Sequence, residues 1–192
     1  MRAAIGSGVR DRNPLPTLWL MTDERMGDAL WPALRALPPG SGVVFRHYAT
    51  PSFARRALFV RVRRIARARR LVLVAARSVG LGRCDGVHGH GRERGPGIRT
   101  WPAHRRAEAL AGVRAGADAL FVSPVFATRS HPGAAALRLG QAVRIGRGLG
   151  RPVIALGGMT AMRFRRIRRY GFDGWAAIDG VTPQTGRTRT TS

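Results

Sequence analysis

Two loops rich in hydroxyl groups and glycine follow apolar segments in the second half of the chain. The first loop comes after residues 119–122, and the second comes after residues 153–156. Hydroxyls and unhindered backbone N–H groups at the carboxyl ends of parallel strands bind phosphate, and a following helix presents its positive end there. The sequence therefore predicts a phosphate site built from both loops. The predicted binding residues are Thr128, Ser130 and His131 in the first loop and Gly157 and Gly158 in the second.

Each of these residues also has a purely structural interpretation. Thr128 and Ser130 would suit a turn that caps the next helix, and a tight turn after a strand would itself require Gly157 and Gly158. Thr160 follows the glycine pair as an expected helix cap, which favours a helix N-terminus beside the anion.

Two further residues are candidates for chemistry because of where they fall. Arg46 directly follows an apolar strand, at the end where barrel enzymes place their sites. His104 follows another strand, and a neutral imidazole suits proton transfer near pH 7. A histidine that caps the start of the next helix is the competing interpretation of His104. His88 is expected to be a hydrogen-bonded structural residue of a strand.

The charge of the chain is unusual because all 34 basic residues are arginine, and the formal net charge is +24. Without lysine the chain cannot form a lysine Schiff base, which excludes lysine-dependent barrel aldolases. Arginine favours bidentate contact with phosphate. The arginines fall on expected solvent faces of helices, without one run interleaved with aromatic residues, so a nucleic-acid partner is not expected and stays the remote alternative.

The elements that must position these residues alternate along the chain. Short apolar strands, expected at 18–21, 43–45, 71–75, 86–88, 98–101, 119–122, 153–156 and 174–178, alternate with amphipathic helices, and the β-then-α unit recurs about eight times. This pattern predicts an α/β fold, a compact TIM (β/α)8 barrel with shortened helices. We expect a flexible leader over 1–16, the barrel over 17–180 and a disordered tail over 181–192.

The composition also bears on location. One cysteine, Cys84, excludes an internal disulfide and fits a reducing cytoplasm. No apolar run is long enough to span a bilayer, so no membrane partner is expected, and residues 1–16 lack the apolar centre of a secretory signal.

Several segments together resemble the thiamine phosphate synthase family, including its thiazole tautomerase branch. The resemblance covers about residues 17–180, and its most specific pair of motifs is 124–128 with 152–159. Other matching segments are Leu18–Asp23, Val43–Arg46, Asp85–His88, Pro102–His104 and Gly116–Leu120.

The resemblance implies an enzyme of thiamine biosynthesis that joins hydroxymethylpyrimidine pyrophosphate to thiazole phosphate and releases pyrophosphate. It implies that Arg46 holds pyrophosphate and that His104, in the tautomerase branch, moves a ring proton. A non-catalytic binder of a phosphorylated thiazole is a further alternative.

The chain departs from the family pattern where the resemblance implies Mg²⁺. The third strand ends in Ala75-Ala76-Arg77 where the family has Asn-Asp-Arg, so one metal carboxylate is missing. Glu93 stands near the second metal position. His131 replaces a lysine, and Asp179 replaces a phosphate-binding serine. A single carboxylate binds magnesium weakly, so full synthase activity and use of the metal are both in question.

Overall fold

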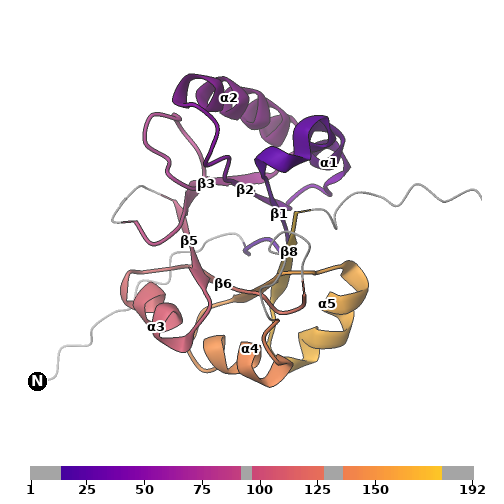
Figure 1. The fold of residues 1–192 in the computed structure, drawn as a ribbon, viewed down its shortest axis with the longest axis vertical. Coiled ribbons are helices and arrows are strands. Elements are labelled where there is room, and N and C mark those ends of the chain that lie inside the picture. The colour runs from indigo at the N-terminus through magenta and orange to yellow at the C-terminus, as the bar shows by residue number, and fades with distance from the viewer. Residues whose placement is uncertain (1–13, 92–96, 128–135, 179–192) are drawn as a thin grey trace, which may run out of the picture.

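Eight parallel strands close into a barrel in the computed structural model, which describes residues 14–91, 97–127 and 136–178. Neighbouring strands pair in sequence order, and β8 returns to pair with β1 (Figure 1). The predicted TIM-type barrel is therefore confirmed. The strands are β1 (Leu18–Met21), β2 (Gly42–Phe45), β3 (Val72–Ala75), β4 (Gly86–His88), β5 (Ile98–Ala103), β6 (Ala119–Val122), β7 (Val153–Leu156) and β8 (Gly174–Ala177).

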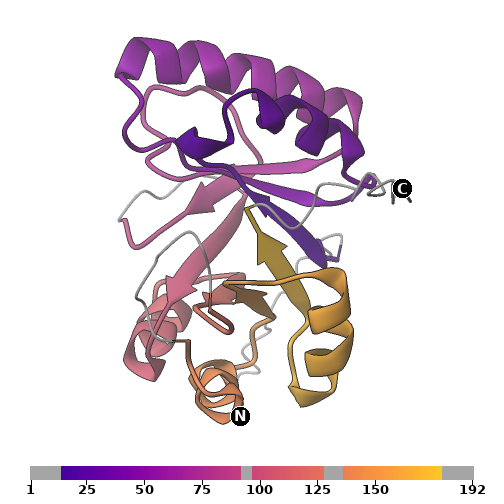
Figure 2. The ribbon, with the colours of Figure 1, turned by 45° about the vertical axis from the view of Figure 1, so that its right-hand side comes forward.

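Short helices cover the barrel unevenly. Helices α1 and α2 lie on one side and α3, α4 and α5 on the other, while no helix among the described residues follows β3 or β4 (Figures 1 and 2). Only α2 exceeds three turns, so the expectation of shortened helices holds. The helices are α1 (Leu30–Ala36), α2 (Ser52–Ala68), α3 (Arg106–Arg114), α4 (Leu139–Gly146) and α5 (Ala161–Ile167), with 3-10 turns η1 (Glu24–Ala29) and η2 (Arg168–Tyr170).

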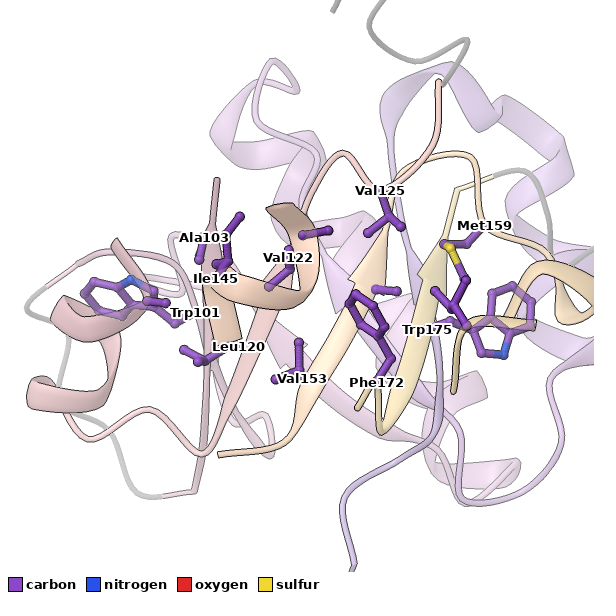
Figure 3. Packing of buried hydrophobic residues seen from close by; sticks show 14 of the residues in the cluster. Trp101, Ala103, Leu120, Val122, Val125, Ile145, Val153, Met159, Phe172 and Trp175 are labelled. Carbon is purple, nitrogen blue, oxygen red and sulfur yellow. The ribbon is translucent and has the colours of Figure 1, made fainter. Parts of the chain in front are cut away.

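Alternation along the strands divides the core into an interior and two outer layers. Inward residues such as Trp19, Phe121 and Ile154 fill the barrel, and Trp19 meets Phe121 edge to face at 5.3 Å between ring centres. One outer layer lies under α1 and α2. The other lies between β5–β8 and helices α3–α5, and Figure 3 shows part of it.

A repeated carboxylate clasp fixes the register at the amino-terminal end of the barrel. An aspartate directly before β4, β6 and β8 accepts a hydrogen bond from a backbone N–H near the start of the preceding strand. The pairs are Asp85 with Leu73 at 2.8 Å, Asp118 with Arg99 at 2.7 Å and Asp173 with Val153 at 2.8 Å. These acids therefore serve the fold at the end opposite the expected site.

Some predicted boundaries differ from the observed ones for local reasons. Ser52, a residue type that often caps helices, is instead the first residue of α2, and Pro51 precedes it without a side-chain bond. The strand expected at 98–101 continues to Ala103, because Pro102 and Ala103 still pair with Phe121 and Val122 of β6. The leader and tail expected at 1–16 and 181–192 fall almost entirely outside the described residues, and the domain limits stay predictions. Among the described helices, none is long and apolar enough to cross a membrane.

Candidate active site at the mouth of the barrel

Arg46 lies at the carboxyl end of β2 and is held against the loop after β1. Its Nε donates to the Thr22 carbonyl oxygen at 2.9 Å, and Nη2 donates to Asp23 Oδ2 at 3.1 Å. Asp23 also caps η1 and accepts from Arg25, and this side-chain bond, together with Arg46, lowers the pKa of Asp23 to about 2. The Arg46 side chain is 15% exposed, and burial lowers the pKa of its guanidinium. Arg46 is therefore a fixed, partly buried cation.

His47, the next residue, is buried and neutral. The Thr22 hydroxyl lies 3.0 Å from His47 Nδ1 and accepts from the Arg46 N–H at 3.1 Å. Burial lowers the pKa of the His47 imidazole. The loops after β1 and β2 thus form one hydrogen-bonded unit at the mouth.

A cavity of about 420 Å³ opens beside this unit, at the carboxyl ends of β3, β4 and β5. The Arg77 guanidinium lies over the Tyr48 ring, 5.0 Å from its centre, at one wall. His90 forms part of another wall, and its Nε2 lies 2.9 Å from the Pro102 carbonyl oxygen. The described lining carries positive charge and no carboxylate, which suits an anionic ligand.

His88 closes the inner end of this cavity as a neutral group. Its Nδ1 lies 2.8 Å from Thr100 Oγ1, and that hydroxyl donates to the Val87 carbonyl at 3.3 Å. The hydroxyl therefore accepts from Nδ1–H, which leaves Nε2 unprotonated. Burial lowers the pKa of His88 to about 3. The expectation of a hydrogen-bonded structural histidine is confirmed.

The turns after β6 and β7 are joined by backbone hydrogen bonds. Val125 N–H donates to the Leu156 carbonyl at 2.9 Å, and Phe126 N–H donates to the Gly157 carbonyl at 3.1 Å. Gly157 and Gly158 have φ values of 99° and 56°, a region that favours glycine. A Cβ at Gly158 would collide with the Ala127 carbonyl oxygen, so the turns approach too closely for a side chain.

The helix that follows this turn is capped as the sequence predicts. Thr160 Oγ1 accepts from the Arg163 N–H at 3.2 Å at the start of α5. In the described part of the predicted phosphate site, the two glycines Gly157 and Gly158 therefore lie next to the capped start of α5.

His104 lies at the same end of the barrel, between β5 and α3, and is exposed. Its Nδ1 lies 2.9 Å from the Ser123 carbonyl oxygen, which can only accept, so Nδ1 carries the proton. In the neutral tautomer Nε2 is therefore the acceptor nitrogen. The backbone N–H of His104, not its ring, contacts the helix start, where Glu108 Oε2 accepts it at 2.7 Å. The imidazole is thus oriented by Ser123 and leaves one nitrogen for proton transfer.

Five residues of the predicted site lie outside the described residues, and their roles stay predictions. They are Glu93, Thr128, Ser130, His131 and Asp179.

The described residues do not fit the magnesium site that the resemblance implies. Ala76 and Arg77 stand at the end of β3, and His88 and His90 are the nearest potential ligands in the cavity. Within 14–91, 97–127 and 136–178, no three His, Cys, Asp or Glu side chains gather closely enough to hold a metal. Magnesium prefers carboxylate oxygens, so we derive no step through a metal.

A second, larger hollow of about 650 Å³ lies at the amino-terminal end, beneath β7 and β8. Asp173 of the carboxylate clasp is one of its lining residues. Barrel enzymes place their chemistry at the carboxyl ends of the strands, where Arg46, His104 and the glycine turn also lie, so we assign the site to the mouth.

Sequence reasoning missed the cavity walls formed by Tyr48, Arg77 and His90. Arg77 is one of 34 arginines, although it is the one residue of the family's Asn-Asp-Arg segment that this chain retains. Its position two residues after β3, equivalent to that of His47 after β2, was one available signal.

Comparison with known proteins settles the family. Residues 73–181, more than half of the chain, match the family described as thiamine monophosphate synthase. The chain belongs to this family. Curated relatives are the thiamine-phosphate synthases of Chloroflexus aurantiacus, 40% identical over 80 residues, and of Desulfitobacterium hafniense strain Y51, 40% identical over 78 residues.

These matches cover 41% and 40% of this chain, and they span only 37% and 38% of the two relatives. Among solved structures, a thiamine phosphate pyrophosphorylase from Pyrococcus furiosus matches 88% of this chain and 89% of its own, with a TM-score of 0.71 and 22% identity. That likeness shows a shared fold.

Proposed function

We propose that the protein is an enzyme of thiamine biosynthesis that joins hydroxymethylpyrimidine pyrophosphate to thiazole phosphate and releases pyrophosphate. Membership of the thiamine monophosphate synthase family supports this proposal. The observation that carries it is the pair of anion-binding features at one barrel mouth. The cationic cavity beside Arg77 would take the pyrophosphate, and the Gly157-Gly158 turn would take the thiazole phosphate. A cytoplasmic location is part of this proposal, since the single cysteine fits a reducing compartment.

The physical demand of this reaction is stabilisation of charge. When pyrophosphate departs, it leaves a pyrimidine carbocation, which the thiazole nitrogen then attacks. Arg77 would bind the departing anion bidentately, and the fixed charge of Arg46 would add to the positive potential at the mouth. Neutral His88 adds no positive charge beside the carbocation.

The phosphate of the second substrate would meet backbone N–H groups of the glycine turn. Gly157 and Gly158 have no side chains of their own, so nothing on these two residues would stand between the phosphate and their backbone N–H groups. Thr128, Ser130, His131 and Asp179 remain the predicted additional contacts.

The direct test is product formation by purified protein from both substrates in buffer that contains magnesium, with thiamine phosphate measured by mass spectrometry. We expect product, and we expect Arg77→Met to lower the rate at least ten-fold. Arg83→Met, in the exposed loop between β3 and β4, is the matched control and should retain activity. Absence of product at every substrate concentration would overturn the proposal.

A second candidate function follows from the geometry of His104. Because Ser123 fixes the proton on Nδ1, Nε2 is a free base at the mouth, as thiazole tautomerisation requires. If the protein is a tautomerase, His104→Ala should abolish proton exchange on the thiazole ring, while thiazole phosphate should bind within two-fold of wild type. Unchanged exchange in this variant would exclude His104 as the base.

A further inference from the structure

A buried arginine ties together the two loops that carry the cationic residues of the mouth. Arg55 lies in the first turn of α2 and is only 9% exposed. Its Nε donates to the His47 carbonyl at 2.9 Å, Nη1 to the Arg77 carbonyl at 3.0 Å, and Nη2 to the Arg46 carbonyl at 3.1 Å. Nη2 also donates to the Ala76 carbonyl. One guanidinium therefore holds two successive carbonyls after β2 and two after β3.

The four carbonyls are equivalent positions on neighbouring strands. Phe45 of β2 pairs with Ala75 of β3, so the residues that follow each strand leave the barrel side by side. A planar guanidinium offers five donors in a fixed arrangement, and this arrangement matches paired carbonyls. A lysine could not reach both loops in the same way.

Two of the held residues have unfavourable backbone conformations. His47 and Arg77 have φ values of 37° and 47°, although neither is glycine. Such a conformation is unfavourable for a residue other than glycine and persists only where the surroundings impose it. Arg55 helps to hold both residues in this conformation, because it donates hydrogen bonds to the carbonyl oxygens of His47 and Arg77.

The position of the Arg55 side chain is itself fixed by stacking. Its guanidinium carbon lies 5.2 Å from the centre of the Phe45 ring. The His47 ring stacks on the same Phe45 ring, at 4.9 Å and 16°. The clamp is thus packed between strand, loop and helix.

We infer that Arg55 is a positioning residue of the reaction: it sets the place of Arg46 and Arg77 at the mouth without lining the cavity itself. The two cations leave the clamp in different directions, Arg46 toward Asp23 and Arg77 toward Tyr48 in the cavity. Without the clamp, the loops after β2 and β3 separate, and the pyrophosphate pocket loses its geometry. The functional part of this inference rests on the proposed function.

The test compares Arg55→Met and Arg55→Lys with Arg56→Met, the adjacent exposed arginine of the same helix turn. Calorimetric titration with inorganic pyrophosphate measures the affinity of the cavity beside Arg77 for this anion. We expect Arg55→Met to weaken binding at least ten-fold and Arg56→Met less than two-fold. Arg55→Lys keeps the positive charge but loses the planar set of guanidinium donors, so it should weaken pyrophosphate binding as much as Arg55→Met. Wild-type affinity in either Arg55 variant would overturn the inference.

Hydrogen exchange separates a failure of the clamp from a failure of the proposed function. The amides of Arg46, Ala49 and Ala76 are hydrogen-bonded in the two loops. They should exchange at least ten-fold faster in the Arg55 variants than in Arg56→Met, while amides of α3 and α4 stay unchanged. Unchanged loop exchange would refute the clamp. If the Arg55 variants show this faster exchange but wild-type protein binds no pyrophosphate, the proposed function fails and the clamp stands.

If Arg55→Met does not fold, Arg55→Lys carries both measurements. In wild-type protein the Nε–H of Arg55 should also resist exchange with water, because it is buried and bonded to His47. Rapid exchange of that proton would contradict the geometry on which the inference depends.

Discussion

Acid should destabilise this protein chiefly through His88. The folded state holds this imidazole neutral, because burial lowers its pKa to about 3, whereas the unfolded chain has the ordinary value of 6.5. Below pH 6.5 the unfolded state binds more protons, so stability falls as the pH falls toward 3. Between pH 7 and pH 4.5 the linkage relation gives a loss of about 2.5 kcal/mol from this residue. His47, whose pKa burial also lowers, acts in the same direction.

The assay is urea unfolding at a series of pH values for wild type and His88→Asn. Asparagine can keep a hydrogen bond to Thr100 but does not titrate, so the variant should lose the larger part of the pH dependence between 6.5 and 4.5. His90→Asn removes an exposed imidazole two residues away and serves as the control. Its free energy of unfolding should change with pH as steeply as that of wild type. Equal slopes in wild type and His88→Asn would show that the buried histidine is not the source and refute the reasoning.

Two other substitutions test separate parts of the structure. Asp173→Ala removes the acceptor for the Val153 N–H and should cost about 1 to 2 kcal/mol in urea unfolding, since the donor then lacks its charged partner; an unchanged midpoint would mean that the clasp contributes nothing. Gly158→Ala places a Cβ against the Ala127 carbonyl at a φ of 56°, and it should lower the affinity for inorganic phosphate at least ten-fold. Wild-type affinity in that variant would argue against a phosphate at the turn.

The barrel could be predicted because its strands are continuous apolar runs. Parallel strands are buried on both faces, so segments such as 119–122 and 153–156 stand out from their arginine-rich surroundings. The start of the first helical region could not be predicted as well. Gly27 has a φ of 47° inside η1 and kinks this segment, so no single regular helix runs from residue 24 to residue 36. The reason is a backbone conformation that the pattern of apolar residues does not encode.

Arg55 shows what sequence reasoning leaves out. The buried face of α2 includes Arg55, Phe59, Val62 and Ala66, a helical spacing that places the arginine on the apolar side. Apolar character alone would favour Leu58, Val62 and Ile65 as the inward stripe, which turns the face by one position. Even the correct face would not name the partners of Arg55, because they are backbone carbonyls and carry no residue identity.

The chemical candidates divide in the same way. His104 was found from its place after a strand, but the bond to Ser123 that fixes its proton required the tertiary structure. The cavity beside Arg77 required the relative placement of three loops.

The central claim is that one barrel mouth holds two distinct anion sites. Calorimetric titration of Arg77→Met and Gly158→Ala with inorganic pyrophosphate and with thiazole phosphate tests it most directly. We predict that Arg77→Met loses pyrophosphate binding and keeps thiazole phosphate, and that Gly158→Ala does the reverse. If both variants weakened both ligands equally, or if wild-type protein bound neither ligand, the account would be contradicted.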